Sequence, residues 1–331
     1  MSKKSKLPIL KKFYIYSLEK IYILNILLLP FSAIYLLVNF IKKNIFINKK
    51  RNTVPVIVVG NLTVGGTGKT SLVIWLANYL NSRKYNIGVI SGGYKTNEPH
   101  KIEIVDENST PSNVGDEAIL IANKTNAIVC KSKNRKSAYE YLVKNYSLDI
   151  IISDDGLTHY ALKRDINIVI VKEKKPFGNG LPIPSGPLRE LPYNIEKYDN
   201  IIFNKSMHSE LPGFYYEIKE LISFDESKLN ISEFSGTSIH LVTAIANPDF
   251  LIKSLRRYNI DVIPHIYPDH QLLSRDDFDF KDNLKIIMTE KDFVKCSDFK
   301  LINTYYIPTK IIVDNDIKIM LNNKISNLLR T

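Results

Sequence analysis

Cysteine is nearly absent from this chain, which has 331 residues and contains only Cys130 and Cys296. Neither cysteine has another close by in the sequence, so a disulfide framework and a cysteine-cluster zinc site are excluded. Internal repeats and low-complexity tracts are also lacking. Hydrophobic residues make up 44% of the chain, which is enough for real cores and too many for a disordered protein. The length favours two domains.

Acidic residues are too few to balance the basic ones, and the formal net charge is +11. Such a surface favours anionic partners, among them nucleic acid, acidic lipid headgroups and phosphorylated substrates. No known nucleic-acid recognition motif accompanies the charge, and lipid phosphates explain it equally well. We therefore expect a membrane surface with anionic lipids as a partner and no nucleic acid, while protein partners stay unknown.

Charge is missing altogether from Ile21 to Ile41, although lysines precede this run and Lys42, Lys43 and Arg51 follow it. The run is close to the roughly 20 residues that cross a bilayer as a helix. No small-x-small cleavage site follows, so a secretory signal peptide is not expected. A spanning helix, a membrane-embedded helix that does not cross, and a buried core helix remain open.

Basic flanks on both sides of this run argue against crossing, because positive segments prefer the cytoplasmic side. Pro30 lies in mid-run, where it removes a helix hydrogen bond and favours a kink. The preferred interpretation is a kinked helix inserted from one side, with lysines reaching anionic headgroups. This interpretation puts the run at the cytoplasmic face of a membrane.

After residue 52, short β-rich runs alternate with helical stretches. Buried strands are predicted at Val54–Val59, Ile87–Ser91, Ala127–Cys130, Asp149–Ser153 and Ile166–Val171. Helices are predicted at Lys69–Leu80, Asp116–Lys124 and Arg135–Tyr146. This alternation predicts an α/β fold with a doubly wound, mostly parallel sheet.

A second α/β set begins near Ile239, with strands expected in "IHLVTAI" and "LKIIMT" and a last helix near Ile317–Leu329. We therefore expect four parts: a membrane-associated segment over 1–52, a phosphate-loop kinase domain over 53–204, a connector over 205–238, and a smaller C-terminal α/β domain over 239–331.

The stretch "VGNLTVGGTGKT" contains most of a phosphate-binding loop between a strand and a helix, as the motif requires. Its backbone N–H groups and the helix N-terminus favour an anion. The residues expected to bind nucleotide are Gly65, Gly66, Thr67, Gly68, Lys69 and Thr70. Lys69 can reach the β- and γ-phosphates of ATP, and Thr70 can ligate Mg²⁺. Thr63 stands where the strict pattern has its first glycine.

The partner motif "DIIISDDG" ends an apolar strand in Asp154 and Asp155. Ligands of α/β proteins bind at the carboxyl edge of such strands, and a carboxylate pair there can hold Mg²⁺ or its waters. Together the two motifs predict a phosphate-loop nucleotide enzyme and leave the phosphate acceptor unnamed.

Further polar motifs lie outside this machinery: "GDE" with Asp116 and Glu117, "LTHYALKRD" with His159, "FGNGLPIPSGPLRE" with Arg189, "YPDHQ" with His270, and "MTEKD". Together with "SGGY" and "ANPDF", their order and spacing resemble the tetraacyldisaccharide 4′-kinase (lipid A 4′-kinase) family over the chain from the apolar run to about residue 296. Members of that family share the loop form without the first glycine. The resemblance implies ATP-dependent phosphorylation of the 4′-hydroxyl of a lipid disaccharide carrying a 1-phosphate.

The resemblance also implies roles for single residues. Asp116 matches the proposed catalytic base, His270 the histidine that partners it, and Lys69 the catalytic lysine of the loop. Thr70, Glu117, Asp154 and Asp155 match the metal-supporting positions. Arg135, His159 and Arg189 match positions near substrate or the transferring phosphate.

Three positions depart from the family pattern, since Gly92 replaces an arginine and Leu157 and Thr158 replace phenylalanine and glutamine. Two other functions are considered, a membrane-associated ATPase acting on a protein partner and a non-catalytic nucleotide-binding module. The retained base and metal positions favour the kinase, as does Val64, where partitioning ATPases often carry lysine.

Overall fold

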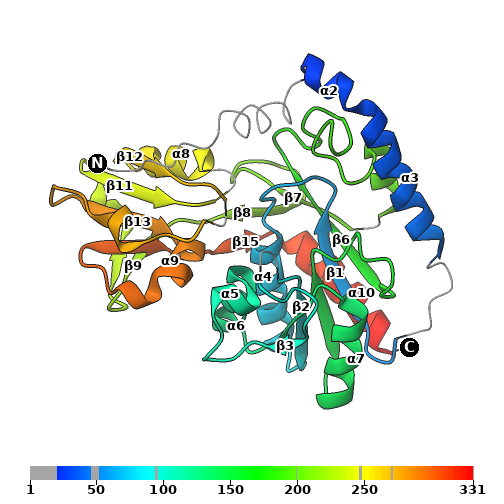
Figure 1. Ribbon diagram of the computed structural model, residues 1–331. Helices are drawn as coiled ribbons and strands as arrows, with labels where there is room; N and C mark the ends of the chain where they lie inside the picture. Colours follow the sequence, from blue (N-terminus) through cyan, green and yellow to red (C-terminus); the bar gives the residue numbers. More distant parts are fainter. Residues whose placement is uncertain are drawn as a thin grey trace. The chain divides into compact units, whose positions relative to one another are not determined.

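A computed structural model describes residues 21–45, 52–93, 96–198, 200–245, 248–269 and 271–330 (Figure 1). The described chain forms two compact units, one built from 21–215 with 311–330 and the other from 216–310. Each unit has its own sheet.

The larger unit is built on a nine-stranded sheet in the order β15-β8-β7-β6-β1-β5-β2-β4-β3. Its strands are β1 (Val56–Asn61), β2 (Ile87–Ser91), β3 (Glu103–Ile104), β4 (Ile128–Lys131), β5 (Ile150–Asp154), β6 (Ile166–Lys172), β7 (Ile201–Asn204), β8 (Gly213–Tyr216) and β15 (Ile311–Val313). All pairings from β8 through β4 are parallel, and β3 is antiparallel to β4. The predicted doubly wound, mostly parallel sheet is confirmed.

Strand β1 is the central strand of this sheet, between β5 and β6. All six of its residues are buried, because "VIVVGN" is an apolar run that fits a parallel strand covered on both faces. The helices of this part are α4 (Lys69–Asn81), α5 (Pro111–Val114), α6 (Asp116–Lys124), α7 (Arg135–Asn145) and α10 (Asn315–Arg330). Helix α4 contacts β1, β2 and β5 and buries Leu72, Leu76 and Leu80, which repeat at helical spacing.

The N-terminal apolar run forms two helices, α2 (Ile23–Leu27) and α3 (Leu29–Ile45), separated at Leu28. Pro30 has no N–H to donate to the preceding turn, which accounts for the break that the sequence predicted. Within the part of the chain that the structure describes, no helix has the length and apolar character needed to cross a bilayer. The apolar side chains of α2 and α3 are largely exposed, so these helices are not buried core helices.

The smaller unit has a six-stranded mixed sheet in the order β10-β9-β14-β13-β11-β12. Its strands are β9 (Glu220–Ser223), β10 (Lys228–Asn230), β11 (Ser238–Thr243), β12 (Asp261–Ile266), β13 (Lys285–Thr289) and β14 (Thr304–Ile307), and its helices are α8 (Asp249–Arg257) and α9 (Glu290–Cys296). Strands β11 to β14 pair in parallel, whereas β9 is antiparallel to β14 and β10.

This division differs from the expected one at both ends of the second α/β set. Residues 205–238 are not a connector, because β8 extends the larger sheet and β9 and β10 extend the smaller one. Strand β15 returns to the larger sheet beside β8, and α10 belongs to the same unit. Long-range strand pairing of this kind leaves no signal in local periodicity.

Candidate active site

The phosphate loop occupies residues 62–68, between the end of β1 and the start of α4. Gly65 and Gly68 have φ of 103° and 92°, values that side chains with a Cβ rarely adopt. Thr63 instead forms an isolated antiparallel bridge with Leu188, so its backbone is extended and needs no glycine. The backbone at this position therefore does not require the glycine of the strict pattern.

Lys69 is held at the centre of the site by two partners. Its Nζ donates to Asn61 Oδ1 at 3.1 Å and lies 3.7 Å from Asp155 Oδ2. Asn61, at the end of β1, is buried and donates its own amide to Thr63 O at 2.6 Å. Asn61 therefore orients both the lysine and the loop. The sequence interpretation did not include it.

Asp155 follows β5 in a left-handed conformation, with φ of 51°. Arg189 Nη1 donates to Asp155 Oδ1 at 2.6 Å. Burial acts to raise the pKa of Asp155, but the charges of Lys69 and Arg189 outweigh burial and hold that pKa below its usual range. Asp155 is thus an ionised carboxylate shared by two cations.

Asp154, the last residue of β5, is in a different state although it is adjacent in sequence. Burial, followed by the nearby Glu117 carboxylate, raises the pKa of Asp154 to about 7. Its Oδ1 atom is buried and has no hydrogen-bond partner among the described residues. An unsatisfied buried carboxylate of this kind is costly unless a cation or a proton joins it.

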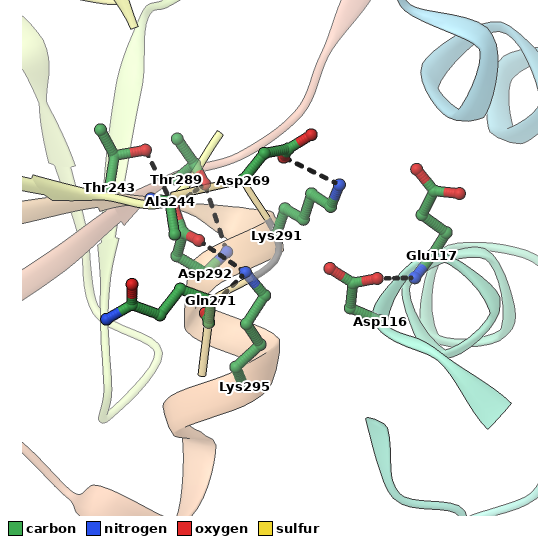
Figure 2. Close-up of polar contacts among 10 residues, drawn as sticks. All are labelled: Asp116, Glu117, Thr243, Ala244, Asp269, Gln271, Thr289, Lys291, Asp292 and Lys295. Carbon is green, nitrogen blue, oxygen red and sulfur yellow. Dashed lines mark hydrogen bonds and ion pairs between the residues drawn. The ribbon is translucent and has the colours of Figure 1, made fainter. Parts of the chain in front are cut away.

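Glu117 and Asp116 begin α6, after Gly115 with φ of 89°. Asp116 Oδ1 accepts from the Glu117 backbone N–H at 3.0 Å (Figure 2). Asp116 is 7% exposed. The Glu117 charge acts to raise the pKa of both Asp154 and Arg135. The structure therefore brings the start of α6 to the same edge of the sheet as the phosphate loop.

Arg135, the first residue of α7, is almost fully buried behind this edge. It donates to Ser132 O at 2.7 Å and to Asp154 O at 2.6 Å, and its Nε has no partner among the described residues. A Cβ at Gly92 would lie 2.9 Å from Arg135 Nη2. The glycine that departs from the family pattern thus leaves room for this guanidinium.

His159 and Arg189 open onto a cavity of about 600 Å³ in the larger unit. Burial first, and the Arg135 charge second, lower the pKa of His159 to about 4, so its imidazole is neutral at physiological pH. Thr158 also lines this cavity, whereas Leu157 is buried and packs over Gly60. The departure at Leu157 is therefore a core-packing change, and the one at Thr158 lies on the cavity wall.

The "MTEKD" motif forms a buried polar network in the smaller unit (Figure 2). Asp292 accepts from Thr243 Oγ1 at 2.9 Å, from Ala244 N at 3.1 Å and from Thr289 Oγ1 at 2.7 Å. Lys295 Nζ lies 2.9 Å from Asp292 Oδ1. These bonds join the ends of β11 and β13 to α9.

His270 lies outside the described residues, so the predicted pair of Asp116 and His270 stays a prediction. Its neighbour Asp269 is 4.0 Å from Lys291 Nζ. Within the described chain, no group of three or more His, Cys, Asp or Glu side chains is arranged to hold a metal ion. This finding leaves open a Mg²⁺ ion that is held by one or two carboxylates together with substrate phosphates.

A phosphate loop on the central strand of a parallel sheet, with its lysine facing a strand-end aspartate, places the chain among the P-loop proteins. A family model described as "Tetraacyldisaccharide-1-P 4'-kinase" matches residues 24–326. The chain belongs to this family.

Individual relatives agree with the family match. The chain is 38% identical to the tetraacyldisaccharide 4′-kinase of Actinobacillus succinogenes over 315 residues, which cover 91% of this chain and 95% of the relative. It is 36% identical to that of Coxiella burnetii over 277 residues, which cover 82% of each. Among solved structures, LpxK from Aquifex aeolicus in complex with ATP superposes with a TM-score of 0.75 at 26% identity, covering 93% of this chain and 100% of that one.

Proposed function

We propose that this protein is an ATP-dependent kinase that phosphorylates the 4′-hydroxyl of a tetraacyldisaccharide 1-phosphate, a lipid A precursor. The observation that carries the proposal is Lys69, held between Asn61 and Asp155 beside the buried Asp154, in a member of the tetraacyldisaccharide-1-P 4'-kinase family. ATP is the phosphoryl donor, in keeping with the ATP complex of the solved relative.

Phosphoryl transfer depends mainly on positioning and charge neutralisation. Backbone N–H groups of Gly65, Gly66, Thr67 and Gly68 surround the β- and γ-phosphates. Lys69 and Arg189 are both within reach of Asp155. Both cations are also available to neutralise the phosphate oxygens of ATP. Their shared aspartate keeps both cations in place before the nucleotide arrives.

Mg²⁺ fits the residues at the end of β5. The Asp154 Oδ1 atom, which has no partner among the described residues, is the oxygen that a cation would satisfy. Thr70 at the start of α4 and Glu117 on α6 would complete the donor set, and Asp155 would support it through Lys69 and Arg189. When bound, Mg²⁺ supplies positive charge to the β- and γ-phosphate oxygens.

Asp116 serves as the base that accepts the proton of the 4′-hydroxyl. The hydroxyl oxygen then forms a bond to the γ-phosphorus, the bond from that phosphorus to the β–γ bridging oxygen breaks, and ADP leaves. His270 stays the predicted partner of Asp116 in this proposal, as the family resemblance implies. Single alanine substitutions should each lower kcat by roughly 10²- to 10⁴-fold, and the double substitution should be scarcely worse, because residues acting as one unit are non-additive. Fully additive losses would separate the two residues.

The cavity beside His159 and Arg189 is the acceptor site in this proposal. Arg135 stiffens its floor, because the guanidinium joins α7 to the end of β5. Neutral His159 is available to accept or donate a hydrogen bond to a sugar hydroxyl.

Helices α2 and α3 attach the protein to the cytoplasmic face of the inner membrane. Their polar residues Asn25 and Ser32 are buried against the protein, whereas Phe31 and Phe40 are 60% and 63% exposed. This inverted arrangement suits a helix whose outer face meets acyl chains.

The proposal is tested by transfer of ³²P from γ-labelled ATP to a tetraacyldisaccharide 1-phosphate in mixed micelles. Labelled 4′-phosphate on the lipid supports it. ATP hydrolysis without labelled lipid would point instead to an ATPase that acts on another partner.

A further inference from the structure

A polar stripe runs along α2 and α3, although both helices are otherwise apolar. Its residues are Asn25, Ser32, Tyr35, Asn39 and Lys42. Within α3, successive members are three or four positions apart, which places them on one face of that helix, and Asn25 lies on α2. This stripe faces the body of the larger unit, while most of the apolar residues between its members are exposed.

The first part of the stripe fixes the helices to residues 177–188, the Gly/Pro-rich loop before Arg189. Asn25 Nδ2 donates to Ser185 O at 2.6 Å. Ser32 Oγ donates to Pro182 O at 3.0 Å and lies 2.7 Å from Ser185 Oγ. All three bonds are buried, so they set the rotation of the helices about their axis. The rest of the stripe is thereby directed to the same side.

The second part of the stripe forms one wall of the cavity that also contains His159 and Arg189. Tyr35, Asn39 and Lys42 all line this cavity. The Asn39 Nδ2 atom is buried and has no hydrogen-bond partner among the described residues. A buried donor without a partner is costly, and an oxygen of a bound molecule would satisfy it.

The charge of the cavity defines the class of that molecule. Basic side chains come from three directions, with Lys42 on α3, Lys133 and Lys136 around the start of α7, and Arg189 after the Gly/Pro-rich loop. Aspartate and glutamate are missing from the described residues that line the cavity. The cavity therefore suits a phosphorylated, hydroxyl-rich headgroup.

We propose that α3 is a wall of the acceptor site as well as an anchor: Asn39 donates a hydrogen bond to an oxygen of the phosphorylated disaccharide, and Lys42 pairs with its phosphate charge. Asn25, Ser32 and Ser185 are positioning residues that hold this wall in register. The inference rests on the proposed kinase function and adds the residues of α3 to the acceptor site.

The chain offers a matched control for each substitution on the same helix. Asn44 and Lys43 also belong to α3, are exposed and do not line the cavity. Asn39→Ala is compared with Asn44→Ala, and Lys42→Ala with Lys43→Ala. The initial-rate assay uses the full chain in neutral detergent micelles without anionic phospholipid. Binding of the acceptor without ATP is measured in parallel by the protection of residues 158–162 from hydrogen exchange.

Asn39→Ala and Lys42→Ala should each raise the KM for the acceptor roughly tenfold, the scale of one lost hydrogen bond or charge contact. The KM for MgATP and binding to anionic vesicles should match the controls. Asn39→Asp replaces the donor by an anion beside the acceptor phosphate, so it should raise the acceptor KM more than Asn39→Ala does. Asn44→Asp should leave the acceptor KM unchanged.

Equal acceptor KM values for Asn39→Ala and Asn44→Ala would overturn the inference while the kinase function stands. Effects that appear only when phosphatidylglycerol is added would also overturn it, because the stripe would then bind bulk lipid headgroups. A wild type that transfers no phosphate to the acceptor contradicts the proposed function instead. In that case the exchange measurement still decides, and equal protection in Asn39→Ala and Asn44→Ala rejects the role of α3.

Discussion

Arg189 joins two parts of the site at once through its contacts with Leu62 and Asp155. Its backbone N–H donates to Leu62 O at 2.7 Å, at the start of the phosphate loop, and its Nη1 donates to Asp155 Oδ1 at 2.6 Å. A long Gly/Pro-rich loop thus ends in a residue that connects β1 with the end of β5. The phosphate loop and the acidic edge are held together by a segment that contacts α2 and α3 as well.

Lys69→Ala should remove most of the activity, because the point charge on the transferring phosphate is lost. We expect a loss in kcat/KM well above tenfold, at the scale of a lost electrostatic contact in the transition state. Lys144→Ala, an exposed lysine of α7, is the matched control. Initial rates over a range of ATP concentrations measure both variants. A loss below tenfold for Lys69→Ala would count against the assignment of the loop.

Arg189→Ala and Asp155→Ala should each lower kcat, and their double substitution should lose less than the product of the two single losses. The reason is that Asp155 is held ionised by Arg189 and Lys69, so the pair acts as a unit. A double-mutant cycle on kcat at saturating MgATP measures the coupling. Independent losses would mean that Arg189 acts on the substrate without help from Asp155.

Replacing Phe31, Ile34 and Phe40 by asparagine should weaken binding to anionic vesicles by several-fold or more, since each side chain is largely exposed and each buried CH₂ group contributes about 0.8 kcal/mol in a membrane. Sedimentation with vesicles measures the effect. Ile302→Asn is the control, because Ile302 is 86% exposed on the smaller unit. Full sedimentation of the triple variant would contradict attachment through α3.

The sequence predicted eight elements of the larger unit within one or two residues, namely β1, β2, β4, β5, β6, α4, α6 and α7, because its buried central strands are continuous apolar runs. Strands β3, β7, β8 and β15 of the same sheet were not predicted. Helix α6, for instance, was expected at Asp116–Lys124 and is found there. The phosphate loop was equally predictable, since its glycines, Lys69 and the flanking strand and helix are contiguous. The return of β15 and α10 to the larger unit was not, because it depends on pairing between β15 and β8, about 100 residues apart in the chain.

The site residues divide in the same way. The contact of Lys69 with Asn61 could have been suspected, because Asn61 ends an otherwise apolar strand directly before the loop. The raised pKa of Asp154 and the lowered pKa of Asp155 could not be predicted. They depend on burial and on the charges of Glu117 and Arg189, which lie far apart in sequence. The direction of the polar stripe on α3 could not be predicted either, because it depends on the hydrogen bond between Ser32 and Ser185.

His159 should make folding stability fall as the pH falls from about 6.5 to about 4. Burial lowers the pKa of the folded-state imidazole to about 4, whereas an exposed histidine titrates near 6.5. Between these two pKa values the unfolded chain binds a proton that the folded chain does not bind. The stabilising contribution of neutral His159 is therefore fully present only above pH 6.5. One such proton accounts for at most about 1.4 kcal/mol per pH unit.

The comparison variant for this pH dependence is His159→Gln, which cannot titrate. Its thermal midpoint should fall less steeply than that of the wild type over this pH range, because all other groups are shared. Parallel curves for the two proteins would show that His159 titrates normally in the folded state.

Asp154 should have the opposite pH dependence. Burial and the Glu117 carboxylate raise the folded-state pKa of Asp154 to about 7, above its ordinary value of 3.8. A raised pKa means that the folded chain keeps a proton that the unfolded chain has lost. The stabilising contribution is therefore fully present below pH 3.8 and disappears as the pH rises through about 7. Asp154→Asn, which stays neutral, should gain thermal stability over the wild type as the pH increases across this range.

Magnesium should cancel the difference in thermal stability between Asp154→Asn and the wild type if the Oδ1 atom of Asp154 is a metal ligand. Deprotonated Asp154 binds the cation, so MgCl₂ with a non-hydrolysable ATP analogue should raise the thermal midpoint of the wild type at pH 8 more than that of Asp154→Asn. Glu117→Gln removes the neighbouring charge and should lower the pKa of Asp154. The loss of thermal stability in this variant should therefore begin at a lower pH than in the wild type. Differential scanning fluorimetry from pH 5 to about pH 8.5, with and without Mg²⁺, measures all three proteins. An Asp154→Asn variant that is less stable than the wild type at pH 8 without Mg²⁺ would show that the buried carboxylate stabilises the fold by itself, and the metal role would lose its structural basis.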